Sequence, residues 1–228
     1  MSCVERLRRL PGLIVVALIF FAGMRAAAAQ SCVSLGDLGK FKNKFVCPVK
    51  GGAAVRSSDA CAPNGGGTFK ARRQGGKLHN ALDMNAPEGT DVVASKPGKV
   101  AVAEPRFGDM GSTVIIDHED GDYSVYGHLA VIKSRKGACV TAGELIGSVG
   151  YTGNAQCLKD NKLSSHLHFA IIRATKSGLA DAGRPIEKAI KSSNDWLEIG
   201  KEFFPGDNLD LGIKDPQVIL GNAKGCLH

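Results

Sequence analysis

The sequence lacks several features that mark common classes of protein. None of its seven cysteines belongs to a CxxC-type pair, so a zinc site built from cysteines is not expected. No internal repeat is present, and the only low-complexity tract is a short run of alanines near the start. The apolar run from Leu13 to Ala22 is shorter than the roughly 20 residues that span a bilayer. A membrane anchor is therefore disfavoured.

Residues 1–29 have the composition of a secretory signal peptide instead. Three arginines (Arg6, Arg8 and Arg9) precede the apolar run, and the small residues Ala27–Ala29 offer a cleavage site before Gln30. We therefore expect an exported protein, periplasmic or secreted, with no stable membrane anchor after cleavage.

The length and net charge of the sequence limit its possible domain organisation and partners. Residues 30–228 suffice for one well-buried domain with extensions, and a monomer is expected. The net charge of the full chain is +7 at pH 7. A positive balance suits a polyanionic partner, which outside the cytoplasm means a cell-wall polymer or a membrane surface, and no nucleic-acid partner is expected.

The cysteines that follow the expected signal peptide are even in number. In an exported chain this favours three disulfides, although spacing does not decide which residues pair. A bridge between Cys139 and Cys157 would hold the loop that leads to His166. The six residues are Cys32, Cys47, Cys61, Cys139, Cys157 and Cys226.

Short runs rich in β-branched and aromatic residues predict a mainly β fold. Turn residues separate them, and the Asp120-Gly121 step is a hairpin signal. Many short strands with tight turns favour an antiparallel, sandwich-like sheet domain over βαβ units. We place this domain at 51–184, with a groove for the substrate. The expected strands are Asp91–Ser95, Lys99–Ala103, Ser112–Asp117, Tyr123–Tyr126, Glu144–Val149 and His166–Arg173.

The two ends of the mature chain are expected to be simpler. Residues 30–50 are predicted to form a leader held by its cysteines. Residues 185–228 are predicted to contain one short helix, Ile186–Phe204, where apolar positions recur at helical spacing. An irregular tail follows from Gly206, and Cys226 is a candidate for fastening it to the body.

Four histidines and one aspartate are the candidate metal-binding and catalytic residues. His166 and His168 alternate along a predicted strand, so their side chains point to the same face. Alone, such a pair is more often a pattern of a half-exposed strand.

His79 and Asp83 are four residues apart, in a loop that is expected to enter a strand. His128 follows the Tyr123 run, and strand alternation places it on the face of Tyr126 and Ser124. Each of these motifs alone is a common accident, whereas together they suggest one metal site. Two histidines and a carboxylate suit zinc and leave a fourth tetrahedral position open for chemistry.

These residues resemble the lysostaphin-type (LytM-like) zinc metallopeptidases, which cleave the cross-linking peptides of bacterial peptidoglycan. The resemblance is good from Ala94 to Arg173 and weaker back to Pro48. It implies that His79, Asp83 and His168 bind one Zn2+ per chain. It also implies that His128 and His166 are the catalytic pair, whereas His118 has a structural role.

The sequence departs from the family pattern at three places. Ala81 replaces a glycine, Cys157–Ser165 form an insertion, and Ala170 replaces a glutamate. These changes affect the fit of the substrate more than the binding of metal.

The resemblance implies a zinc-dependent endopeptidase acting on peptidoglycan. Zinc would acidify a water molecule and polarise the scissile carbonyl. We assign His166 as the base and His128 as the group that stabilises or protonates the tetrahedral species, and the reverse order stays open. The alternatives are a non-catalytic member of the same fold that binds the wall or activates another hydrolase, and a disulfide-linked structural protein with scattered histidines.

Overall fold

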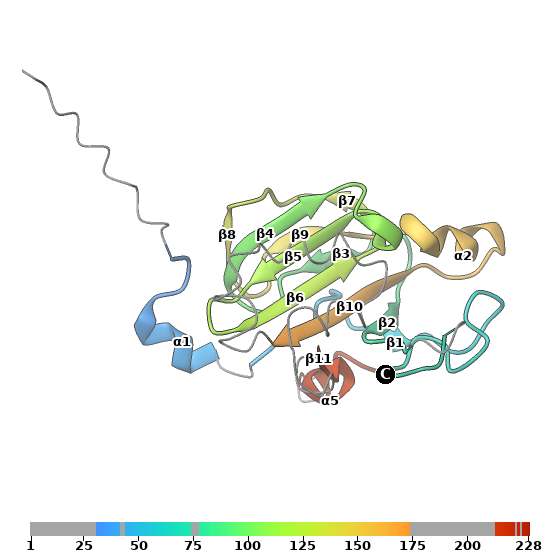
Figure 1. Ribbon diagram of the computed structural model, residues 1–228, viewed down its shortest axis with the longest axis horizontal. Helices are drawn as coiled ribbons and strands as arrows, with labels where there is room; N and C mark the ends of the chain where they lie inside the picture. The colour runs from blue at the N-terminus through green and yellow to red at the C-terminus, as the bar shows by residue number, and fades with distance from the viewer. Residues whose placement is uncertain (1–30, 42–43, 74–77, 174–212, 222, 224) are drawn as a thin grey trace, which may run out of the picture. The chain divides into compact units, whose positions relative to one another are not determined.

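Strands dominate the structure, a computed structural model, and they form two antiparallel sheets (Figure 1). The antiparallel β fold expected from the sequence is confirmed. The large sheet has the order β1 (Ala54–Val55), β2 (Leu82–Asn85), β10 (His166–Arg173), β6 (Asp122–Gly127), β5 (Thr113–Asp117), β4 (Gly98–Glu104) and β8 (Cys139–Val140), and β11 (Ile213–Lys214) also pairs with β10. The small sheet has the order β3 (Asp91–Val93), β9 (Leu145–Val149) and β7 (Leu129–Ile132).

The structure describes residues 31–41, 44–73, 78–173, 213–221, 223 and 225–228. The expected signal peptide at 1–29 and the expected helix Ile186–Phe204 lie outside these residues. The helical segments described are α1 (Leu35–Phe41), η2 (Gly108–Met110), η3 (Gly153–Ala155), α2 (Gln156–Asp160) and α5 (Pro216–Leu220). Within these ranges, no helix has both the length and the apolar character needed to cross a membrane.

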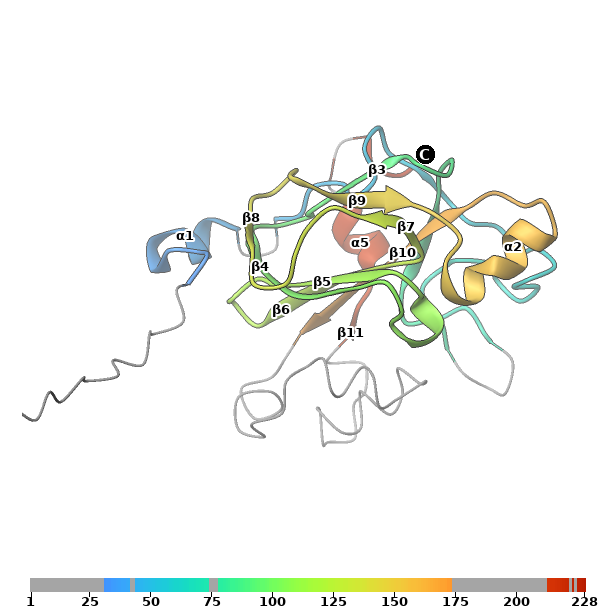
Figure 2. The ribbon, with the colours of Figure 1, turned by 90° about the horizontal axis from the view of Figure 1, so that it is seen from above.

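The main core lies between the two sheets, which face each other in Figure 2. Alternation along β10 explains this arrangement, because Leu167, Phe169 and Ile171 point to the core and pack with residues of both sheets. The neighbouring residues Ala170 and Ile172 point to the opposite face of the large sheet, where a second apolar cluster forms. His166 and His168 occupy the same alternate positions of β10 as these two residues, so they lie on this second face.

All six cysteines of the described chain form disulfides, as the sequence predicts. The pairs are Cys32–Cys139, Cys47–Cys226 and Cys61–Cys157. The suggested bridge between Cys139 and Cys157 is therefore wrong. The bridge to Cys47 does fasten the C-terminal tail, which contains a short strand and a short helix in addition to irregular chain.

His118 is a buried structural residue, in line with the expectation. Its side chain is 1% exposed, its Nδ1 lies 2.8 Å from the carbonyl oxygen of Pro97, and its Nε2 lies 2.9 Å from Ser124 Oγ. Burial lowers the pKa of His118 to about 4. The imidazole is therefore neutral in the folded protein near neutral pH.

This depressed pKa predicts a specific loss of stability in acid. As the pH falls below about 6.5, His118 takes up a proton in the unfolded chain before it does so in the folded one, so stability declines between pH 6.5 and about 4. Between pH 7 and pH 5 this residue accounts for a loss of about 2 kcal/mol. Urea unfolding at both pH values should show that His118→Asn, although less stable at pH 7, loses correspondingly less on acidification. Equal losses in both proteins would contradict the assignment.

Candidate metal centre and catalytic site

The pairing of β2 with β10 brings the first two site residues together. In this antiparallel pair His168 lies directly opposite Asp83, and His166 lies opposite Asn85. Directly opposed residues share a face of the sheet and have neighbouring side chains. Asp83 and His168 are therefore adjacent although 85 residues separate them.

His79 completes a compact triad. Asp83 Oδ1 lies 3.0 Å from His79 Nε2 and 3.0 Å from His168 Nδ1, and the two nitrogens are 3.3 Å apart. The three ligand atoms lie within 4.8 Å of one another. The structure thus brings together the three residues expected to bind metal.

The segment before β2 holds His79 in place. The expected loop entering a strand is present, and backbone hydrogen bonds join His79 to Lys70 and Ala71. His79 Nδ1 lies 3.0 Å from the carbonyl oxygen of Thr68, to which only an N–H can donate. Its Nε2 therefore carries the lone pair that faces the triad. Ala81 fits here without a positive φ and is buried in the second apolar cluster.

The two other histidines line the same site. The ring of His128 lies 4.9 Å from that of His166 and 5.5 Å from that of His168, measured between centroids. His166 Nε2 lies 3.4 Å from Asp83 Oδ1, and its Nδ1 is buried without a hydrogen-bond partner among the described residues. All five side chains predicted from the sequence are therefore gathered at one place.

The expected face of His128 is wrong, however. Tyr126 points into the main core, where its hydroxyl contacts Ser95. His128 follows the end of β6 with a φ of 61°, which breaks the alternation of the strand. Its Nδ1 lies 2.9 Å from the carbonyl oxygen of Thr152, and this contact directs the ring into the site.

Burial and charge set the protonation of the site. Burial alone would raise the pKa of Asp83, but the attraction of His166 and His79 and the hydrogen bonds from His166 and His168 outweigh it, so this pKa lies well below its usual value. Burial lowers the pKa of His128 well below normal, and the fields of His166 and His168 lower it further. Burial also lowers the pKa of His168, against the opposing effect of Asp83. The geometry thus combines one ionised carboxylate with two imidazoles, those of His128 and His168, that burial favours in the neutral form.

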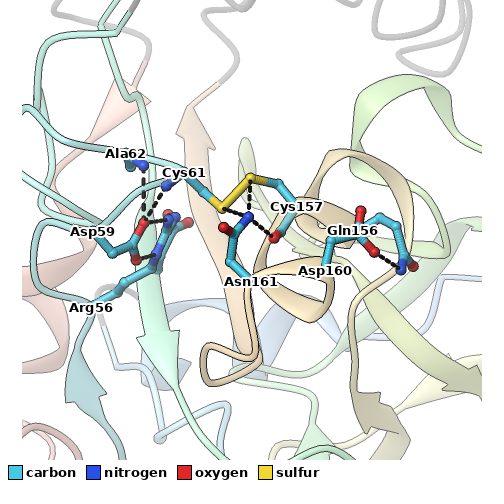
Figure 3. The surroundings of a disulfide bond; sticks show 9 residues. Arg56, Asp59, Cys61, Ala62, Gln156, Cys157, Asp160 and Asn161 are labelled. Atoms are coloured by element: carbon cyan, nitrogen blue, oxygen red, sulfur yellow. Dashed lines mark hydrogen bonds and ion pairs between the residues drawn. A yellow bond between two sulfur atoms is a disulfide. The ribbon is translucent and has the colours of Figure 1, made fainter.

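Two arginines that sequence reasoning missed contact the other oxygen of Asp83. Arg56 Nη1 lies 3.3 Å and Arg73 Nη2 lies 3.6 Å from Oδ2. Arg56 also forms a two-point ion pair with Asp59, at 2.7 and 2.6 Å (Figure 3). Both arginines come from a polar, glycine-rich stretch without periodicity, so no signal in the sequence connects them to Asp83.

The walls of the site enclose a cavity of about 470 Å³. The disulfide Cys61–Cys157 joins two of these walls, because Cys61 follows the Arg56–Asp59 pair and Cys157 belongs to α2 (Figure 3). The insertion recognised in the sequence therefore builds part of the cavity. The lining residues are Arg56, Cys61, Ala62, Arg73, Leu78, His79, Asn80, Asp83, Asp109, Met110, His128, Asn154, Ala155, Cys157, Leu158, His166 and His168.

A close approach of η2 and η3 forms the remaining wall. Gly111 and Gly153 both have positive φ, and a Cβ on Gly153 would come within 2.2 Å of the carbonyl oxygen of Asp109. Only glycine fits such contacts. They hold Thr152 where it meets His128.

The donor atoms of this site fit a zinc ion. Zinc prefers imidazole nitrogen and carboxylate oxygen, and catalytic zinc sites use three protein ligands. The contact from Thr68 to His79 is the kind of outer hydrogen bond that orients a metal-binding imidazole. His79, Asp83 and His168 supply three suitable donor atoms on buried side chains.

Comparisons with known proteins point to one peptidase family. Residues 77–180 match the profile of Peptidase family M23. The chain is 30% identical over 115 residues to the cell division protein DipM of Caulobacter vibrioides, covering 50% of this chain and 17% of DipM. It is 38% identical over 93 residues to the DD-carboxypeptidase/endopeptidase Mpg of Neisseria meningitidis, covering 41% and 20%. It is 31% identical over 110 residues to the murein hydrolase activator NlpD of Escherichia coli, covering 48% and 26%. The chain thus spans only about a quarter or less of these relatives.

Solved structures with a similar fold include the catalytic domain of lysostaphin from Staphylococcus simulans. It has 24% identity and a TM-score of 0.42, and the match covers 53% of this chain and 88% of that one. A zinc containing peptidase from Vibrio cholerae has 27% identity and a TM-score of 0.39, covering 53% and 36%.

The disulfide in the cavity wall predicts a coupling between stability and the site. Replacing Cys61 and Cys157 by serine should lower the free energy of unfolding by about 3 kcal/mol, because the unfolded chain loses a long cross-link. The double replacement of Cys32 and Cys139 is a matched control, since the two bridges span 96 and 107 residues. Both variants should be destabilised, but only the first should bind zinc more weakly in a competition titration. Equal zinc affinity in both variants would show that the bridge does not support the site.

Proposed function

The chain belongs to peptidase family M23, and we propose that it is a zinc-dependent endopeptidase that hydrolyses the peptide cross-links of bacterial peptidoglycan. One observation carries this proposal. Three side chains with metal-binding atoms and two further imidazoles lie together on the walls of one cavity.

His79, Asp83 and His168 would hold the zinc ion through Nε2, Oδ1 and Nδ1. When bound, zinc supplies Lewis acidity, which acidifies a water molecule and polarises a peptide carbonyl. Asp83 contributes one negative charge to the site. The opposite oxygen of Asp83 contacts Arg56, which is held by Asp59 and helps to orient the carboxylate.

His128 is the better-placed general base. Its Nδ1–H donates to the carbonyl oxygen of Thr152, so its Nε2 carries a lone pair toward the cavity. A base that is oriented by a third group is the arrangement that such catalysis requires. This order of roles is the reverse of the one first assigned from the sequence, which left it open.

His166 then supplies the second imidazole. It lies on the strand of His168, two residues earlier, and on the same face of the sheet. From there it can donate a proton to the developing oxyanion or to the leaving amine.

The proposed substrate and location follow from several features. DipM is a cell division protein, Mpg a DD-carboxypeptidase/endopeptidase, and NlpD a murein hydrolase activator, which supports a role in the cell wall. Three disulfides fit an oxidising compartment, so we place the protein in the periplasm or outside the cell. We also propose that it acts as a monomer.

The name of NlpD supports a second candidate, a non-catalytic activator of another hydrolase. Such a protein has no need of a metal triad and two further imidazoles in one cavity. Retention of all five residues therefore favours the enzyme.

Metal removal separates these two functions. The purified protein should contain about one zinc per chain and release soluble fragments from peptidoglycan. A chelator should abolish this release, and added zinc should restore it. Binding to peptidoglycan without any release of fragments, with or without zinc, would favour the activator.

Two substitutions test the division of roles. His168→Ala should lose zinc and therefore all turnover. His128→Ala should retain zinc and lose turnover about 100-fold or more, because it removes the base and not a ligand. Zinc content by elemental analysis and initial rates on a defined muropeptide provide the measurements. Equal loss of zinc in both variants would show that ligands and catalytic residues are divided wrongly.

A further inference from the structure

The two arginines beside the triad differ in how their hydrogen-bond donors are used. Arg56 directs Nε and Nη2 to Asp59 (Figure 3). Its Nη1 lies 3.3 Å from Asp83 Oδ2, so each part of its guanidinium has a carboxylate partner. Its side chain is 7% exposed. The guanidinium of Arg56 is therefore fully used in ion pairs within the protein, and its role is structural.

The guanidinium of Arg73, in contrast, has hydrogen-bond donors that are not fully used. Its Nη2 lies 3.6 Å from Asp83 Oδ2, beyond normal hydrogen-bond length. Its Nη1 is buried, and no hydrogen-bond partner for it exists among the described residues. The Arg73 side chain is 23% exposed, but a buried N–H group without a hydrogen-bond partner is costly, since it has lost its hydration. Arg73 therefore has spare donors in a site where donors are normally paired.

Arg73 lies on the wall of the cavity, where its unused donors can reach a bound substrate. Arg73 lines the cavity together with His79, His128 and His166. Asp109, another carboxylate on the wall, forms no ion pair with Arg73 within the described part of the chain. Within the described residues, Asp83 pairs with Arg73 but already contacts Arg56 and the histidines, and Asp59, whose charge also acts on Arg73, is paired with Arg56. Among the described residues, no carboxylate lies within hydrogen-bond distance of this guanidinium.

We propose that Arg73 is a specificity-determining residue that binds a carboxylate of the substrate, so that the cavity selects peptides with a free carboxylate close to the bond that is cut. A guanidinium presents parallel N–H groups that match the two oxygens of a carboxylate, and such charge-assisted bonds are strong. The inference rests on the proposed peptidase function and specifies its substrate class.

A purely structural role for Arg73 makes a different prediction. If Arg73 only supported Asp83, its loss would weaken zinc binding and slow the cleavage of every substrate to the same extent. If it binds a substrate carboxylate, its loss affects only substrates that carry this group. Two substrates that differ in this one feature therefore distinguish the two roles.

The experiment compares one muropeptide with free carboxylates and the same muropeptide with its carboxylates converted to primary amides. The wild-type protein should cleave the carboxylate form with a kcat/KM about tenfold or more above that of the amide form. Arg73→Gln should remove this preference by lowering kcat/KM for the carboxylate form, with little change for the amide form and with unchanged zinc content.

Arg72→Gln is the matched control. It removes the same charge from the adjacent position, where the side chain is exposed and absent from the cavity wall. This variant should keep the wild-type preference. Loss of the preference in both variants would point to the general field of the surface and would overturn the assignment to Arg73.

Calorimetric binding of the two muropeptides to the same proteins separates this inference from the proposed function. If neither muropeptide is cut, the peptidase function fails, whereas tighter binding of the carboxylate form that depends on Arg73 still supports the inference. Equal binding and equal cleavage of both forms by the wild-type protein would overturn the inference alone. Loss of zinc from Arg73→Gln would likewise overturn it in favour of the structural role.

Discussion

The register between β2 and β10 is the constraint on which the site depends. It sets Asp83 opposite His168 on the face of the sheet that points away from the main core. A slip of one residue would turn these side chains to the opposite face and expose the core residues Leu167 and Phe169. The hydrophobic packing that stabilises the fold therefore also fixes the geometry of the triad.

A second constraint is the burial of charge around Asp83. Its carboxylate lies among imidazoles on one side and Arg56 and Arg73 on the other, in surroundings that would disfavour an isolated charge. Arg56 is in turn held by Asp59. The polar segment before β2 thus acts as a support for the site, although its sequence has the composition of a loop.

The disulfides complete this support in a domain made of short elements. The bridge Cys61–Cys157 links the arginine segment to α2, and the bridge Cys47–Cys226 links the leader to the tail. Both connect parts of the chain that share few hydrogen bonds of regular structure. Cross-links of this kind restrict the unfolded chain most when they join distant residues.

The antiparallel β class, the involvement in bridges of the six cysteines after residue 30, and the five side chains of the site could all be predicted from the amino-acid sequence. Periodicity and turn residues are local signals. The pairs His79–Asp83 and His166–His168 each lie within a few residues, and the resemblance to a known family connects them with His128. The pairing of the cysteines, the departure of His128 from the face of its strand through a positive φ, and the contacts of Arg56 and Arg73 with Asp83 emerge only in the folded chain. These features depend on contacts between segments far apart in the chain, and local residue patterns contain no information on such distances.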